Sequence, residues 1–134
     1  MITPLRYDEG RVVKLQDATV SDTTITKNDL LDYASGYLQR ATNATTEVRF
    51  MAMEDKTTAE AAHEDLLVLN LDGVECEADT NASVTVGNVG VARDLTDHAT
   101  IDDTTNTDKV FFVTEMVGAS TDKKVRGYFC VKYL

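Results

Sequence analysis

The sequence predicts an all-β protein, either a small β-barrel or a β-sandwich, with an extended N-terminal arm and at most one short helix. Short runs rich in Val, Ile, Thr and aromatic residues recur along the 134 residues, and Gly, Asn, Asp and Ser turn signals separate them. Several runs alternate apolar and polar residues, which is the pattern of a strand with one buried face. The length fits an arm over residues 1–9 and a single β-rich domain over residues 10–134.

The overall charge disfavours some classes of partner. The formal net charge is -10 and the pI is near 4.5, so the surface repels a phosphate backbone and we expect no nucleic-acid partner. No run reaches membrane-spanning length, and the first residues lack the basic start and apolar core of a signal peptide. We therefore expect no membrane partner and synthesis in a cytoplasm.

The first nine residues carry the only proline, Pro4, between Ile2 and Leu5. Proline disfavours the helical region for the residue before it, so this stretch is expected to be extended. Its apolar side chains Ile2, Leu5 and Tyr7 leave two alternatives open. The arm folds back on its own body, or it lies on a neighbouring molecule as an added strand.

The next part of the chain predicts two strands and a hairpin. Residues Arg11–Leu15 form a short run of strand-favouring residues. The runs Leu30–Ala34 and Tyr37–Ala41 flank Ser35-Gly36, which predicts a hairpin. Residues Glu47–Met53 alternate cleanly and predict a half-buried strand.

One short stretch favours a helix. Residues Glu54–His63 are polar and rich in alanine, and Thr58 suits the N-cap of a single turn. We expect this turn to lie on the surface and to lead into the central strands.

The stretch Glu64–Ala78 predicts a second hairpin, in which Asp72-Gly73 supplies a tight turn between two apolar runs. In the return strand Val74, Cys76 and Ala78 share a face that we expect to be buried. The outgoing strand is apolar on both sides, so both sides should be covered. A closed barrel, a sandwich or a subunit interface satisfies this requirement, and the residues on one of its faces are Leu67, Leu69 and Leu71.

The last third of the chain predicts a final pair of strands, Val110–Val117 and Val125–Tyr133. Gly127 inside the second strand indicates a bulge or a close backbone contact. The glycines of Gly87–Gly90 do not form a phosphate-binding loop, because no helix pattern follows them.

Residues that commonly carry chemistry are few. His63 and His98 lie in polar segments, and we interpret each as a solvated surface residue. The loop Asp102–Asp108 places oxygen-bearing side chains at alternate positions, as a calcium loop does, but the glycine and the closing glutamate of such a loop are absent. Cys76 and Cys130 are expected to be reduced and unpaired. We therefore predict no catalytic residues, no metal site and no cofactor.

Several stretches together resemble the small β-rich decoration, or cement, proteins of tailed-bacteriophage heads. The stretches that carry the resemblance cover most of the chain after the arm, and they are Asn28–Leu38, Phe50–Glu54, Leu66–Ala78, Val89–Leu95 and Val125–Phe129.

The resemblance implies a non-enzymatic, head-stabilising structural protein of the virion. Such a protein binds the outer surface of the expanded capsid and clamps adjacent major capsid subunits, commonly as a homotrimer, after assembly in the host cytoplasm. The subunit interface is then expected at Leu67, Leu69 and Leu71. The capsid-binding arm is expected at Ile2, Pro4, Leu5, Arg6 and Tyr7, so deletion of Met1–Tyr7 should weaken attachment and leave the body folded.

Two other readings of the sequence remain. One is a small ligand-binding or enzymatic β-barrel with a site near His98 and the Asp102–Asp108 loop. The other is a different virion component, such as a tail-tube or head-completion protein, which would assemble into rings or tubes.

Overall fold

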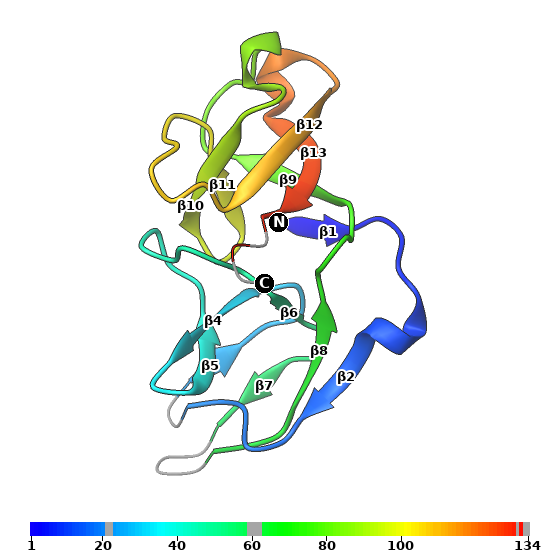
Figure 1. Cartoon of the computed structure of the whole chain (residues 1–134), viewed down its shortest axis with the longest axis vertical. Helices are drawn as coiled ribbons and strands as arrows, with labels where there is room; N and C mark the ends of the chain where they lie inside the picture. The colour runs from blue at the N-terminus through cyan, green and yellow to red at the C-terminus, as the bar shows by residue number, and fades with distance from the viewer. Residues whose placement is uncertain (21–22, 59–62, 131, 133–134) are drawn as a thin grey trace.

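The computed structural model describes residues 1–20, 23–58, 63–130 and 132, and strands make up most of the regular secondary structure of the described chain (Figure 1). The six-stranded sheet has the order β1 (Ile2–Pro4), β9 (Cys76–Thr80), β11 (Thr100–Asp102), β10 (Ala92–Asp97), β12 (Phe111–Val117), β13 (Lys124–Phe129). The five-stranded sheet has the order β2 (Val12–Leu15), β8 (Leu66–Asn70), β6 (Phe50–Ala52), β4 (Leu30–Ala34), β5 (Tyr37–Arg40). A small ribbon pairs β3 (Thr24–Ile25) with β7 (Lys56–Thr57).

The helical residues are three single turns of 3-10 helix, η1 (Glu9–Arg11), η2 (Val86–Asn88) and η3 (Ser120–Asp122), within the described ranges. The all-β prediction is confirmed. Of the expected helical turn, residues 59–62 lie outside the described residues, and the residues just before Thr58 form β7.

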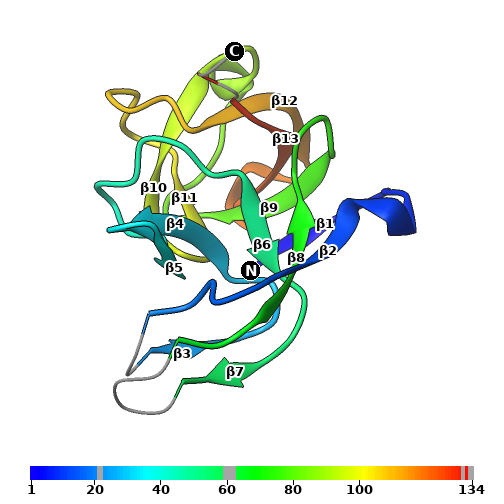
Figure 2. The ribbon, with the colours of Figure 1, turned by 60° about the horizontal axis from the view of Figure 1, so that its bottom comes forward.

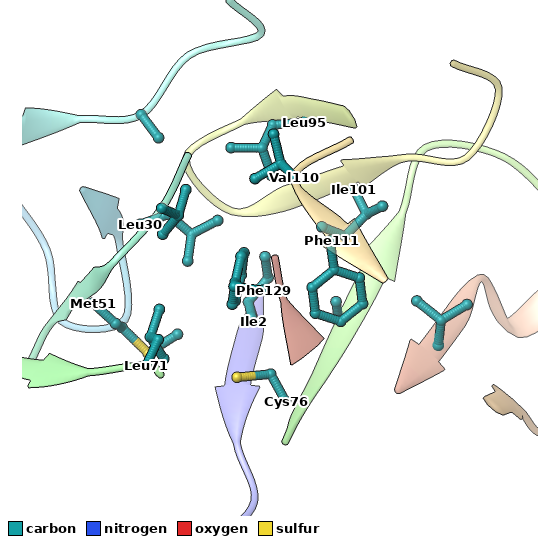
Figure 3. Close-up of a cluster of buried hydrophobic side chains, with 14 of the residues drawn as sticks. Ile2, Leu30, Met51, Leu71, Cys76, Leu95, Ile101, Val110, Phe111 and Phe129 are labelled. Carbon is teal, nitrogen blue, oxygen red and sulfur yellow. The ribbon is translucent and has the colours of Figure 1, made fainter. Parts of the chain in front are cut away.

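The two large sheets lie above and below one main hydrophobic core (Figures 1 and 3). The six-stranded sheet contributes Ile2, Cys76 and Phe111, and the five-stranded sheet contributes Leu30 and Met51. All five side chains are fully buried. Because both sheets bury one face in this cluster, their relative position is set by apolar contact.

A second, smaller core lies on the other face of the five-stranded sheet. Leu31 and Val68 pack there with Ile25 of the β3–β7 ribbon, which lies at the bottom of the view in Figure 2. Strand β8 therefore faces two cores. Leu66 and Val68 belong to the smaller one and Leu69 and Leu71 to the main one, so the prediction of a strand covered on both sides is confirmed.

The predicted hairpin over Glu64–Ala78 is wrong, because β8 and β9 belong to different sheets. Both edges of β8 are already paired, with β2 and with β6. The turn itself exists, closed by a hydrogen bond from Val74 N to Leu71 O of 3.0 Å. However, only Gly73 has a positive φ, of 73°, whereas a two-residue hairpin of type I′ needs positive φ at both central residues. The chain consequently crosses to the other sheet.

The strands of the six-stranded sheet are joined in a closed circuit. The order from β9 through β11, β10 and β12 to β13 returns to β9, where Val125 pairs with Ala78. The circuit is tight at Gly127, since an added Cβ there would lie 1.9 Å from the carbonyl oxygen of Phe112. The predicted close backbone contact at this glycine is confirmed. Substitution by alanine would push β12 and β13 apart.

Candidate binding surface beside the N-terminal arm

The arm begins as a strand of the protein's own sheet. Ile2 pairs with Ala78 and Pro4 with Cys76, and Leu5 N donates a hydrogen bond of 2.9 Å to Glu75 O. Ile2 has no exposed surface and lies in the main core. Its proposed role as a capsid contact is therefore wrong, because the body already buries its side chain. Deletion of Met1–Tyr7 would also remove this core residue and would not leave the body intact.

After Leu5 the arm leaves the sheet and crosses the surface to η1 and β2, on the right of the view in Figure 1. Leu5 and Tyr7 are each 40% exposed, and Arg6 is also exposed. The far end of this segment is tied down by Arg11, whose guanidinium donates a hydrogen bond to Asp72 O. The segment is thus held at both ends while its side chains face outward.

Two adjoining grooves run beside the arm. The first has a volume of 360 Å³ and is lined by Leu5, Arg6, Gly73, Glu75, Arg126 and Tyr128. The second has a volume of 300 Å³ and is lined by Arg6, Tyr7, Asp8, Arg11, Gly73 and Val74. Arg6 and Gly73 line both grooves, so the two lie next to each other, and we call them together the arm trough.

Cross-strand pairs of polar side chains hold the floor of the arm trough. Tyr128 Oη donates a hydrogen bond of 3.2 Å to Glu75. The Glu75 carboxylate raises the pKa of Tyr128, so the phenol stays protonated and remains a donor. Arg126 lies 3.3 Å from Glu77 and 3.8 Å from Glu115. Its charge is therefore shared between two carboxylates of the protein itself.

Arg6 of the arm and Arg11 of η1 differ from Arg126. Within the described residues Arg6 has no hydrogen bond or ion pair, and Arg11 bonds only to a neutral carbonyl oxygen. Asp8 lines the second groove, but no ion pair joins it to either arginine in the described chain. Two guanidinium groups with unused donors therefore stand along an apolar and aromatic surface.

The leucines expected at a subunit interface occupy other places. Leu69 is fully buried and Leu71 is 1% exposed, both in the main core of the same chain. Their assignment to an interface between subunits is wrong, because the six-stranded sheet of the same molecule covers them. Leu67 is half-buried and its backbone N donates to Glu54 Oε1 at 2.9 Å.

His98 and the Asp102–Asp108 loop do not form a common site. His98 Nε2 lies 3.6 Å from Asp29 Oδ1, and Asp29 is also 2.6 Å from Arg40 Nε. His98 precedes β11, whereas the loop follows β11. His98, between β10 and β11 of the six-stranded sheet, therefore contacts Asp29, which directly precedes β4 of the five-stranded sheet. His63, the other histidine, stacks on Tyr37 with ring centroids 3.8 Å apart.

The acidic loop folds around a carboxylate that the sequence did not single out. Asp94 accepts hydrogen bonds of 2.8 to 3.0 Å from the backbone N of Thr107, Asp108 and Lys109. Burial by itself raises the pKa of Asp94, but these hydrogen bonds, together with one from the Thr105 hydroxyl, outweigh it and hold the pKa below its usual value. Asp102 accepts from the backbone N and the hydroxyl of Thr104. The loop is ordered by its own backbone donors.

The two cysteines do not form a disulfide. Cys76 and Cys130 are both free, and Cys76 is fully buried. Burial, with a smaller effect of Glu75, raises the pKa of Cys76 to about 12, so its thiol stays protonated.

Among the described residues no three His, Cys, Asp or Glu side chains are grouped in a way that could hold a metal ion. The part of the chain that the structure describes also contains no helix suited to crossing a bilayer.

Sequence reasoning found part of the arm trough and missed the rest. Leu5, Arg6 and Tyr7 were singled out because the arm is apolar and carries a proline. Arg11, Arg126 and Tyr128 come from other segments and were missed. The exposed face of the final strand was the available signal, since Arg126 and Tyr128 alternate there with core residues.

Comparison of the chain with protein-family models, curated proteins and solved structures finds no match. The resemblance to phage decoration proteins therefore stays a prediction.

Proposed function

We propose that this protein is a non-enzymatic structural component of a tailed-phage virion, attached to the outer surface of the expanded capsid. The observation that carries the proposal is the arm segment, which is fixed to the body by the backbone of Leu5 and by the side chain of Arg11 while apolar side chains remain exposed. A surface that is ordered before binding loses little conformational freedom on binding. Such a surface suits a clamp that must hold many copies on a shell.

In this proposal the protein contacts the major capsid protein through Leu5, Arg6 and Tyr7 and stabilises the shell by binding only its expanded form. Many copies around a closed shell multiply a weak individual contact. The protein attaches as a homotrimer at three-fold positions. Contacts between its subunits are supplied by exposed side chains such as Tyr33, which is 51% exposed, in place of the buried leucines.

Attachment to undecorated, expanded heads tests the proposal. The double variant Leu5→Asp/Tyr7→Asp should lose attachment in a co-sedimentation assay, because it places two charges on the contact surface. Its free energy of unfolding should change by less than about 1 kcal/mol, since both side chains are exposed. A matched double variant, Val13→Asp/Val86→Asp, changes exposed apolar residues that do not line the arm trough and should attach normally.

Unchanged attachment of Leu5→Asp/Tyr7→Asp would remove the arm from the contact. Failure of the unaltered protein to bind expanded heads of any phage that encodes it would reject the proposed function. The oligomeric state is read separately from the native mass, where a trimer is expected and rings or tubes would indicate another virion component.

A further inference from the structure

We propose that the arm trough binds an extended acidic peptide segment of the partner protein, with its carboxylates on Arg6 and Arg11 and its apolar side chains against Leu5 and Tyr128. The inference rests on the proposed function for the identity of the partner, which is then the capsid protein. The chemistry of the trough itself is independent of that identity.

The positive charge of the arm trough favours an anionic ligand. The chain has six arginines against a net charge of -10, and three of them, Arg6, Arg11 and Arg126, line the trough. Arg40 and Arg126 are neutralised by carboxylates of the protein, whereas Arg6 and Arg11 have no such partner within the described ranges. In an acidic protein, positive charge without an internal partner is complementary to an external anion.

The geometry of the arginine N–H donors favours a carboxylate as that anion. A guanidinium group presents several N–H donors in a fixed plane and pairs with a carboxylate through two parallel hydrogen bonds. Among the residues that the structure describes, no group accepts a hydrogen bond from the guanidinium of Arg6, and Arg11 uses NH1 for Asp72 O. That bond orients Arg11 and leaves its other donors available.

The apolar lining selects a peptide over a small anion. Leu5, Tyr7 and Tyr128 are each between 37% and 40% exposed along the trough. Phe112 pairs directly with Tyr128 across the strands and is 41% exposed, so the apolar surface continues onto β12. A ligand that fits must offer apolar side chains as well as carboxylates, and an extended peptide with alternating residues offers both.

The test uses a fluorophore-labelled peptide of four Glu-Leu repeats, blocked at both ends, and measures fluorescence anisotropy at low salt. A Lys-Leu peptide of the same length is the control for unspecific attraction, because a protein of net charge -10 would favour the basic peptide if only overall charge mattered. We expect saturable binding of the acidic peptide. Addition of salt should weaken it, since the contacts are ionic.

Two variants locate the binding. Arg6→Glu/Arg11→Glu should raise the Kd for the acidic peptide by at least about tenfold, because two charge-assisted contacts become repulsive. Lys27→Glu/Lys109→Glu changes the net charge equally at exposed positions away from the trough and should change the Kd less than about twofold. The single variant Arg6→Glu, which leaves the Arg11 bond to Asp72 in place, should still raise the Kd if the double variant proves unstable.

Absence of saturable binding up to about 1 mM acidic peptide would overturn the inference. Equal loss in both double variants would overturn it too, and so would preferential binding of an octathymidylate, which carries phosphates in place of carboxylates. Attachment to expanded heads is a separate measurement from peptide binding. If Arg6→Glu/Arg11→Glu lost the peptide but still attached to heads through Leu5 and Tyr7, the acidic segment would not belong to the capsid, and the proposed function would stand.

Discussion

The N-terminal arm and the loop after β11 are both surface segments fixed by one buried group, but the two groups act through different physics. The arm is fixed by Ile2, an apolar side chain in the main core. The loop is fixed by Asp94, a carboxylate that gathers three backbone N–H groups. The carboxylates of Asp94 and Asp102 accept hydrogen bonds from the loop, whereas the arm leaves Leu5, Arg6 and Tyr7 exposed.

The contrast between the apolar anchor and the carboxylate anchor indicates where a binding surface arises in this molecule. The acidic loop is the segment whose composition suggested an ion site, yet the carboxylate of Asp102 accepts hydrogen bonds within the loop, and the loop backbone donates to Asp94 of β10. The arm needs only backbone pairing and one apolar anchor, so Leu5, Arg6 and Tyr7 stay available. Two substitutions and a change of pH distinguish the apolar anchor Ile2 from the carboxylate anchor Asp94.

The largest effect is expected for Ile2→Ala. Removing most of a fully buried side chain from the main core should lower the free energy of unfolding by about 3 kcal/mol. The backbone amide of Leu5, bonded to Glu75 O, should exchange with solvent faster. Urea unfolding and NMR hydrogen exchange measure the two effects. Thr3→Ala, at the adjacent exposed position, is the control, and an equal loss there would contradict a specific apolar anchor.

A smaller loss, of about 2 kcal/mol, is expected for Asp94→Ala, because the backbone N–H groups of Thr107, Asp108 and Lys109 lose a charged acceptor. These three amides should lose protection from hydrogen exchange, while Leu5 keeps its protection. Asn106→Ala in the same loop changes an exposed side chain and serves as the control. Retained protection at the three amides in Asp94→Ala would show that the loop is ordered by other contacts.

The smallest effect is a difference in acid sensitivity. The pKa of Asp94 is held below its usual value in the folded protein, so its stabilisation is present above the unfolded pKa, near 3.9, and is lost as the pH falls through the folded pKa. Asp94→Asn should therefore lose less stability than the unaltered protein on acidification. Ile2→Ala should follow the pH profile of the unaltered protein. Urea midpoints measured between about pH 2.5 and 6 give the comparison, and identical profiles for Asp94→Asn and the unaltered protein would contradict it.

Prediction from the sequence worked where a local pattern decides the outcome. The alternation of Val74, Cys76 and Ala78 with acidic residues placed the buried face of β9 correctly. Gly127 was correctly interpreted as a close contact. The carboxylate of Asp94 was not found, because its partners lie 13 to 15 residues away in a loop that the pattern of the strand does not describe.

Two turns separate the effect of local residue type from the effect of strand pairing across the whole molecule. Ser35-Gly36 and Asp72-Gly73 were both interpreted as hairpin turns. The first is one, with φ of 52° and 87° and its strands paired. The second turns the chain just as clearly but sends it to the other sheet, because β2 and β6 already occupy both edges of β8. Residue type and alternation fix where the chain turns and which face is buried, since these depend on neighbours in sequence. The partner of each strand, and with it the surface beside the arm, depends on competition among all strands for the same edges and the same core.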